Sequence, residues 1–256
     1  MGSSRAEGTG QRAEKPEDCL RGKTALITGS TQGLGLAAAK AFAAAGCRII
    51  NNGLAGGKYV GADLRQPAEI DAMIKDAGAI DILINNAVVR HSAPIESFDV
   101  DRWNEALAVN LSAAFHTIRL ALPGMKARGW GRIINMSSIY SQRGAADRVG
   151  YVTTKTALIG LTRAVALEIV GTGVTCNAVC PGTTETPVHD ATIEALMQDG
   201  GLTRAEAVRT FLTGKQPTRK IIAADDVAAM LVFLCGPSSN DINGSIFPID
   251  AGWSAG

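Results

Sequence analysis

Tyr151 and Lys155 are the two residues whose types and spacing point most directly to chemistry. They stand four residues apart in a stretch, 151–170, whose pattern predicts a helix, so both side chains fall on one helix face. A tyrosine hydroxyl is a poor base at its ordinary pKa of about 10, but a neighbouring cation stabilises the phenolate. The pair can therefore take the hydroxyl proton of an alcohol as a hydride leaves the adjacent carbon. For such a pair taken alone, a solvated helix face is the alternative interpretation.

A glycine-rich segment, TGSTQGLG at residues 28–35, joins the first predicted strand to the first predicted helix. Gly29 permits a tight turn, Gly33 lets a pyrophosphate approach the backbone, and Gly35 lets the helix pack closely on the sheet. The N-terminus of the helix then offers unpaired N–H groups to a phosphate. The segment predicts a dinucleotide-binding loop at the start of the fold.

Short β-branched runs alternate with helical patterns along the chain, which indicates βαβ units and a parallel sheet. The predicted strands are 24–28, 48–51, 58–61, 80–85, 132–137, 174–179 and 245–249, and the predicted helices are 35–45, 67–77, 101–128, 151–170 and 224–234. We expect an α/β fold with a single doubly wound parallel sheet, Rossmann-like, of about seven strands.

The domain organisation follows from this rhythm. Residues 1–20 read as a disordered tail without the apolar core of a signal peptide, and 21–256 as a single domain. Residues 188–217 form a helical insert that is predicted to be a substrate lid, with a surface excursion as the alternative. Only a few residues, 55–57, separate the second and third predicted strands, so the usual crossover helix is missing there.

Composition excludes several classes of protein. With 46% hydrophobic and 19% charged residues, the 256-residue chain is not intrinsically disordered. Its 25 basic and 24 acidic residues leave a net charge of +1, which gives no basic face for nucleic acid or an anionic membrane. No apolar run reaches the length of a membrane span. Five scattered cysteines indicate a reducing compartment, which predicts a cytoplasmic protein, and no second pair at ligand spacing accompanies Cys176 and Cys180, so no metal is expected.

The Gly-x-x-x-Gly-x-Gly spacing resembles the short-chain dehydrogenase/reductase superfamily. Further elements in the same order strengthen the resemblance over nearly all of residues 20–256: Asn85-Asn86-Ala87, Asn110, Ser138, Tyr151 with Lys155, and Pro181-Gly182. Within the superfamily, the segments 110–116, 131–135 and 215–217 look most like those of D-3-hydroxybutyrate dehydrogenases.

The resemblance implies roles for individual residues. Tyr151 is the acid/base, Lys155 its ammonium partner, Ser138 a hydrogen-bond donor to the substrate oxygen, and Asn110 a residue that kinks its helix and fixes a proton-relaying water. Thr186 steadies the nicotinamide or caps the insert, and Asp63 contacts adenine or forms a turn. The implied cofactor contacts are Gly29, Thr31, Gln32, Gly33, Leu34, Gly35, Leu54, Asp63, Leu64, Asn86, Ala87, Tyr151, Lys155, Pro181, Gly182, Thr184 and Thr186.

The charged residues restrict which cofactor and which class of substrate the protein is expected to bind. Residues 51–54 after the second strand offer neither an acid for the ribose nor a cation for a 2′-phosphate, so NAD is favoured over NADP. Where the resembling enzymes hold a small carboxylate, this chain has Arg90, Tyr140, Arg148 and Thr192, and Ser138 completes the predicted substrate site. We expect a different substrate, anionic or polyoxygenated, unless both arginines are surface residues.

The sequence thus predicts an oxidoreductase that interconverts a secondary alcohol and its ketone with NAD. The alternative is a catalytically weak dinucleotide-binding sensor or scaffold, motivated by Val88, where the family usually has glycine, and by the short second crossover. Val88 must point away or narrow the pocket. The resemblance further implies a homotetramer built on helices 101–128 and 151–170 and on the segment 247–253.

Overall fold

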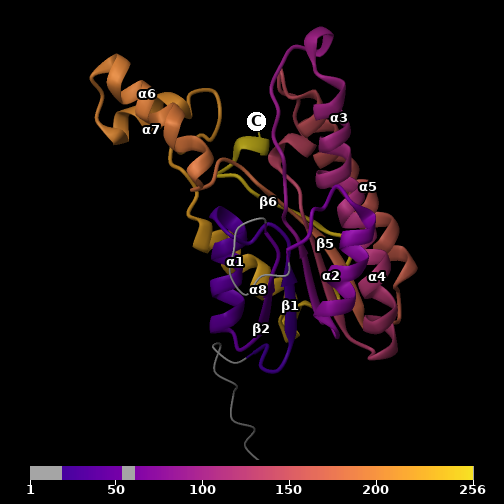
Figure 1. Ribbon diagram of the computed structural model, residues 1–256. Helices are drawn as coiled ribbons and strands as arrows, with labels where there is room; N and C mark the ends of the chain where they lie inside the picture. The colour runs from indigo at the N-terminus through magenta and orange to yellow at the C-terminus, as the bar shows by residue number, and fades with distance from the viewer. Residues whose placement is uncertain (1–18, 54–60, 256) are drawn as a thin grey trace, which may run out of the picture.

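The computed structural model describes residues 19–53 and 61–255, which build one parallel β-sheet (Figure 1). The strand order is β2-β1-β3-β4-β5-β6, and every neighbouring pair is parallel. The strands are β1 (Thr24–Ile27), β2 (Arg48–Asn51), β3 (Ile82–Asn85), β4 (Gly131–Met136), β5 (Val174–Pro181) and β6 (Ile246–Ile249). The predicted α/β, Rossmann-like class is confirmed. The strand order reverses between β1 and β3, so a crevice opens there at the carboxyl ends of the strands.

The strand count differs from the sequence prediction. The described residues contain six strands rather than about seven. The strand predicted at 58–61 lies outside the described residues except for Gly61, which belongs to no strand, and the short connection predicted at 55–57 lies outside them entirely. The described sheet therefore ends at β2 on this side.

Helices cover both faces of the sheet (Figure 1). One face is covered by α1 (Gly33–Ala44) and α8 (Ala224–Cys235), which pack against each other. The opposite face is covered by α2 (Pro67–Ala77), α4 (Ala113–Ala127) and α5 (Val149–Glu168). The predicted helix 67–77 has the observed bounds, and α5 and α8 differ from their predictions by at most two residues.

Alternation along the strands separates the two halves of the core. Successive side chains of a strand point to opposite faces, so Leu26 and Leu83 pack on the α2, α4 and α5 side. Ile27 and Ile84 pack on the α1 and α8 side instead. Leu20, the last residue of the predicted tail, is 2% exposed and belongs to this second half, whereas residues 1–18 of that tail lie outside the described part of the chain.

The helix predicted at 101–128 is three segments. It consists of α3 (Val100–Leu107), a π-helical turn (Ala108–Ser112) and α4. Asn110 lies in the π-helical turn, in agreement with the predicted irregularity at this residue. The wider turn changes the direction in which side chains leave the helix, and such turns are frequent at functional sites.

The insert after β5 carries two helices that stand away from the sheet (Figure 1, orange). A 3₁₀ turn (Pro187–His189) leads into α6 (Asp190–Gly200), and α7 (Arg204–Phe211) follows and packs on α6. The first turn of α7 is closed by a capping box between Thr203 and Glu206. In the described part of the chain, no helix has the length and apolar character that a membrane span requires.

The turn from β1 into α1 depends on glycine at two positions. Gly29 has a φ of +63°, and a Cβ there would lie 2.8 Å from the Cα of Ala87. A Cβ at Gly35 would lie 2.2 Å from the carbonyl oxygen of Gly29 and 2.6 Å from Nδ2 of Asn86. The close approach that the sequence predicted for Gly35 is therefore between α1 and its own loop, together with Asn86, rather than between α1 and the strands.

We expect Gly35→Ala to lower the free energy of unfolding by about 1–3 kcal/mol, because the added methyl group forces the loop away from the helix. Urea denaturation followed by circular dichroism measures this change. Gly144→Ala is the matched control, since a Cβ there meets nothing within 4 Å. Equal stability of the two variants would contradict the packing described here.

Candidate active site

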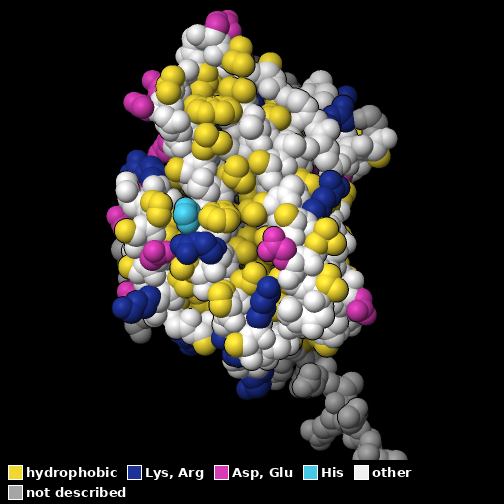
Figure 2. All heavy atoms as spheres, turned by 90° about the vertical axis from the view of Figure 1, so that its right-hand side faces the viewer, with side chains coloured by type: hydrophobic (Ala, Val, Ile, Leu, Met, Phe, Trp, Pro, Cys, Tyr) yellow, Lys and Arg dark blue, Asp and Glu magenta, His cyan; other side chains and the backbone are white. Residues whose placement is uncertain are grey.

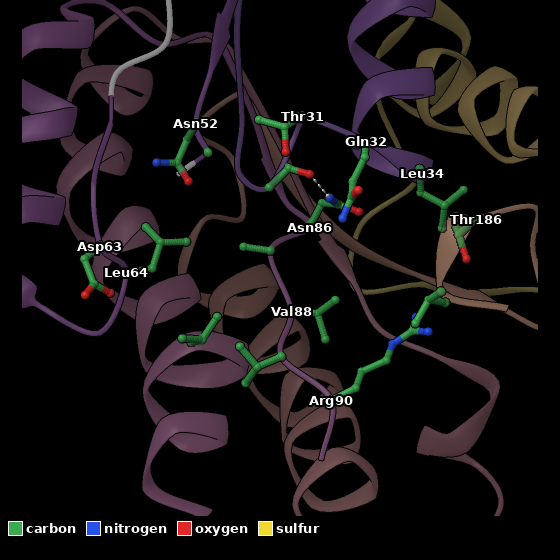
Figure 3. A pocket seen from close by; sticks show the side chains of 18 of the residues that line it. Thr31, Gln32, Leu34, Asn52, Asp63, Leu64, Asn86, Val88, Arg90 and Thr186 are labelled. Carbon is green, nitrogen blue, oxygen red and sulfur yellow. Dashed lines mark hydrogen bonds between the residues drawn. The ribbon is translucent and has the colours of Figure 1, made fainter. Parts of the chain in front are cut away.

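A cleft with a volume of about 810 Å³ opens at the carboxyl ends of β1, β2 and β3 (Figure 3). Six parts of the chain line it: the glycine loop, the end of β2, the segment 62–65, the segment after β3, the stretch of α3 and the π-helical turn that carries Glu105 and Val109, and the start of the insert. The predicted cofactor residues in this lining are Gly29, Thr31, Gln32, Gly33, Leu34, Gly35, Asp63, Leu64, Asn86, Ala87 and Thr186. Its size and its glycine-lined wall fit a dinucleotide, because backbone without side chains lets a pyrophosphate approach the N–H groups at the start of α1.

Asn86 and Thr28 hold the glycine loop in place. The Asn86 side-chain amide donates to the carbonyl oxygens of Thr28 (3.0 Å) and Gly29 (2.9 Å). The Thr28 hydroxyl accepts from the backbone N–H groups of Asn86 (3.0 Å) and Ala87 (3.1 Å). The loop is thereby fixed to the end of β3 before any ligand binds, which lowers the entropic cost of binding. Thr28 was not singled out from the sequence, where only its place before the glycines marked it.

The end of the cleft that holds Asp63 carries a charged network that the sequence did not predict. The Arg65 guanidinium contacts Asp63 (2.6 Å) and Glu105 (3.5 Å), and Nε2 of His91 lies 2.7 Å from Glu105. The hydrogen bonds from Arg65 hold the pKa of the Asp63 carboxyl below its ordinary value. Two carboxylates therefore flank one guanidinium here, and Figure 3 places Asp63 at the opposite end from Thr186.

Ser138, Tyr151 and Lys155 are all buried, and none of them lines the cleft. Ser138 follows β4, while Tyr151 and Lys155 occupy the first turns of α5. The Lys155 ammonium lies 5.8 Å from the centre of the Tyr151 ring, as their spacing on one helix face predicts. Arg90 connects this group to the cleft, because it lines the cleft and its guanidinium lies 5.3 Å from the Tyr151 ring centre.

Lys155 is 3% exposed and donates a 2.6 Å hydrogen bond to the carbonyl oxygen of Met136 at the end of β4. Burial, and to a smaller extent the positive charge of Arg90, lower the pKa of its ammonium to about 7. A lysine that titrates near neutrality can exchange its proton during a reaction, which an exposed lysine does not do at this pH.

The side-chain amide of Asn110 forms hydrogen bonds with other residues of the protein. Its Oδ1 accepts from the backbone N–H of Val89 (2.8 Å), and its Nδ2 donates to the carbonyl oxygen of Val89 (3.1 Å) and to the Thr154 hydroxyl (3.2 Å). The amide thus fixes the segment that carries Val88 and Arg90. Val88 lines the cleft and is 36% exposed, so it narrows the pocket rather than pointing away from it.

Two hydroxyl residues beside the predicted catalytic ones position α5. Ser137 donates from its hydroxyl to the carbonyl oxygen of Lys155 (2.7 Å), and Thr154 donates to that of Gly150 (2.7 Å). Tyr140 packs edge-to-face on Tyr151, with ring centres 6.2 Å apart, and on Trp253, at 5.4 Å. The ring of Tyr151 is therefore held between side chains from three parts of the chain: Arg90, Tyr140 and Lys155.

The remaining predicted site residues that the structure describes lie outside the cleft lining. Pro181 ends β5, Thr184 bridges to Ile222, and Gly182 abuts Gln216 and Asp250. Arg148 is half-buried just before α5, and Thr192 is exposed on α6. Leu54 lies outside the described residues. The cleft has lining residues that sequence reasoning missed, namely Asn52, Gly53, Ala62, Arg65, Val88, Val89, Glu105, Val109, Pro187 and Val188.

All five cysteines are free thiols, and four of them are buried. Within residues 19–53 and 61–255, no group of three or more His, Cys, Asp or Glu side chains is placed to hold a metal ion.

A nucleotide-sized cleft at the switch point of a doubly wound sheet, beside a buried Tyr-Lys pair, defines the class of this protein. The family model described as short chain dehydrogenase matches residues 23–196, and the chain belongs to this family.

Relatives match over nearly the whole chain. D-beta-hydroxybutyrate dehydrogenase of Cupriavidus necator is 42% identical, with 92% of this chain and 99% of the relative covered. The enzyme of the same name from Rhizobium meliloti is 40% identical, with 91% and 99% covered. Among solved structures, L-sorbose reductase from Gluconobacter frateurii, complexed with NADPH and L-sorbose, superposes with a TM-score of 0.88 at 27% identity, covering 94% of this chain and 99% of that one.

The lowered pKa of Lys155 leads to a prediction about its charge. In the cofactor-free protein, the Lys155 side chain should lose its proton as the pH rises through about 7, because its folded-state pKa lies below the ordinary value of 10.5. In Arg90→Gln this pKa should rise, since one repelling positive charge is gone. NMR titration of labelled lysine side chains measures both values. A Lys155 signal that titrates above pH 10 in both proteins would contradict the burial described above.

Proposed function

We propose that this protein interconverts a secondary alcohol, such as a hydroxy acid or another anionic or polyoxygenated alcohol, and its ketone with NAD, and that Tyr151 is the general acid/base. One observation carries the proposal: Tyr151 is buried beside Lys155 and is joined through Arg90 to the nucleotide-sized cleft. The names of the two hydroxybutyrate dehydrogenases and of the sorbose reductase agree with an alcohol as substrate.

Each residue of the pair performs part of the proton transfer. In the oxidation direction, the Tyr151 phenolate takes the proton of the substrate hydroxyl as the C–H bond of the same carbon breaks, and the C–O bond becomes a carbonyl. The bound nicotinamide supplies the acceptor for the hydride. The Lys155 ammonium stabilises the phenolate before the transfer, and the Ser138 hydroxyl donates a hydrogen bond to the substrate oxygen.

For Asn110 we propose a positioning role in place of the water relay implied by the resemblance. Its amide is already paired with both backbone groups of Val89 and with Thr154. It holds the π-helical turn, the segment after β3 and α5 together. A change at Asn110 would therefore displace Arg90 relative to Tyr151.

The charges around the cleft favour NAD over NADP. The described residues directly after β2, Asn52 and Gly53, carry no charge, and Arg65 is paired with Asp63 and Glu105. A 2′-phosphate at this end of the cleft would meet a net negative charge and find no free cation among these residues. The sorbose reductase was solved with NADPH, so NADP stays the alternative for this family.

Substrate contacts are assigned to residues around Tyr151. The Arg90 guanidinium and the Tyr140 ring both contact the Tyr151 ring. Arg148 is a second cation, three residues before Tyr151 in the chain. Thr192 is exposed on α6, and in the proposal it contacts the substrate when the insert, residues 188–217, closes as a lid. We retain the lid as part of the proposal because the insert begins at Val188, which lines the cleft.

We further propose a cytoplasmic homotetramer. Exposed apolar side chains lie on or beside α4 and α5, including Phe115 (48% exposed), Leu167 (77%) and Val170 (70%). Figure 2 shows hydrophobic side chains gathered on the face that these helices occupy. Apolar patches of this kind are typical of subunit interfaces. Five unpaired thiols agree with a reducing compartment.

The alternative of a sensor or scaffold without catalysis is weaker. The narrowing by Val88 is its remaining motive, since the short second crossover lies outside the described residues. The three relatives named above are called dehydrogenases or reductases, and a protein that only binds a dinucleotide has no physical need for a buried Tyr-Lys pair.

Removing the Tyr151 hydroxyl tests the proposed function. We expect Tyr151→Phe to lower kcat by at least about 100-fold, because the group that exchanges the proton is lost. NADH formation is followed with a panel of hydroxy acids, sugar alcohols and cyclic alcohols. The dissociation constant of NADH, measured by fluorescence, is the control and should stay within a factor of about two, since the ring and its packing remain. Wild-type turnover in this variant would refute the mechanism.

Cofactor choice is tested by comparing NAD and NADP. We expect NAD to bind at least about tenfold more tightly than NADP, which corresponds to one unfavourable charged contact. Asp63→Asn should reduce this preference, because it removes one carboxylate and releases Arg65 toward a phosphate. Fluorescence titrations of both reduced cofactors give the four constants. A preference for NADPH in the wild-type protein would overturn the assignment.

A further inference from the structure

Three cationic side chains come from separate parts of the fold, and one of them, Arg90, lies beside the Tyr151 ring. Arg90 follows β3, Arg148 immediately precedes α5, and Lys215 lies after α7 at the end of the insert. In the described part of the chain, none of the three is in salt-bridge contact with a carboxylate. Most other charged groups near the cleft are paired, as Arg65 is with Asp63. A set of unpaired cations at one site indicates that an anion is meant to complete it.

Ring contacts show where these cations lie. The Arg90 guanidinium lies 5.3 Å from the Tyr151 ring centre, and the Lys215 ammonium lies 3.8 Å from the Phe211 ring centre. The His189 ring packs on the same Phe211, with centres 5.3 Å apart. In Figure 3, the Arg90 side chain extends toward the end of the cleft where Thr186 lies, which is where the insert begins. Arg90 thus lies beside Tyr151 on the segment after β3, whereas Lys215 lies in the insert on the Phe211 ring that also contacts His189.

Electrostatic coupling agrees with this grouping. Burial and then the charge of Arg148 lower the pKa of Lys215. Burial, Arg90 and Lys215 lower the pKa of His189 to about 4, with a smaller contribution from Arg148. Asp190 acts in the opposite direction on His189, but its carboxylate contacts Arg204 at 3.0 Å. His189 is thus neutral at pH 7, and the positive charges of Arg90, Lys215 and Arg148 all act on it.

We propose that the alcohol substrate carries two anionic groups, one received between Arg148 and Lys215 and the other at Arg90. The inference rests on the proposed function and narrows its substrate class to dianionic hydroxy acids. A single carboxylate between Arg148 and Lys215 leaves Arg90 uncompensated above the Tyr151 ring. A second carboxylate on the other side of the carbinol carbon pairs with the Arg90 guanidinium, whose planar fork suits a carboxylate.

Arg90 has one competing assignment, because it also lines the cofactor cleft. If it instead contacts the dinucleotide, its loss weakens NADH binding and affects every substrate equally. The experiment below separates the two cases, since cofactor affinity and anion preference are measured independently.

Succinate and butyrate form a matched pair of unreactive probes, because succinate is butyrate with its methyl group replaced by a carboxylate. Calorimetry on the protein–NADH complex measures the affinity of each. We expect succinate to bind at least about tenfold more tightly than butyrate, the size of one charge-assisted hydrogen-bonded contact. The preference should fall below about threefold in Arg90→Gln, while butyrate affinity and NADH affinity stay within a factor of about two.

Lys215→Met should weaken both probes, because it removes a cation from the shared site. Arg209→Gln is the matched control, since it removes a positive charge from an exposed position of the same insert and should change neither affinity. Retained cooperative unfolding of each variant ensures that lost binding is not lost folding. The inference is overturned if the probes bind equally, if neither binds, or if Arg90→Gln leaves the preference unchanged or weakens NADH tenfold.

Turnover provides a second readout. Malate is 3-hydroxybutyrate with its methyl group replaced by a carboxylate, and 3-hydroxyglutarate extends that group by one carbon. We expect kcat/KM to be at least about tenfold higher for one of these dianions than for either enantiomer of 3-hydroxybutyrate. The monomethyl ester of 3-hydroxyglutarate keeps the shape without the second charge and should lose this advantage. A higher kcat/KM for 3-hydroxybutyrate would refute the inference but leave the proposed role of Tyr151 intact. Conversely, if Tyr151 is not the acid/base, the preference for succinate should still be measurable, because Tyr151→Phe keeps the cationic side chains.

Discussion

The burial of the Lys155 ammonium is the constraint on which the rest of the site depends. An ammonium taken out of water is stable only when its donors find acceptors, and the carbonyl oxygen of Met136 is one that the fold supplies. This bond joins α5 to the end of β4, and Ser138 is the second residue after that strand. The hydroxyl of Ser137 makes the reciprocal bond to the carbonyl oxygen of Lys155. Helix, strand end and active-site serine are therefore fixed relative to one another by the same contacts that keep the charge buried.

The sheet topology explains why the cleft lies beside this group. Because the strand order reverses between β1 and β3, the segments that follow them diverge and leave room for a ligand. Asn86 closes one side by holding the glycine loop, and Asn110 closes the other by holding Val89. Two side-chain amides, one directly after β3 and one in the π-helical turn, thus fix the two walls. Arg90 follows Val89 directly, so the position of its charge above Tyr151 depends on the second of these amides.

Local patterns predicted the elements well, and non-local contacts account for what they missed. The helix 67–77 and the two halves of the core follow from periodicity, and the Tyr151–Lys155 spacing places both on one helix face. The break within 101–128 could not be predicted in its extent, because the π-helical turn is paired through Asn110 with a residue 21 positions away. Arg65 was missed since its partner Glu105 comes from a distant helix. The burial of Lys155 likewise depends on β4, which its own sequence neighbourhood does not reveal.

The distribution of charge links the two ends of the site. The end of the cleft near Asp63 carries two carboxylates around Arg65, while the end near Tyr151 carries unpaired cations. The positive charge of Arg90 favours the neutral form of Lys155, yet the ammonium is the form that stabilises a phenolate. An anion bound at Arg90 would offset that repulsion and so raise the pKa of Lys155, although burial, the larger cause, continues to lower it. Substrate binding would then shift Lys155 toward the ammonium form as the carbinol and the phenol are brought together.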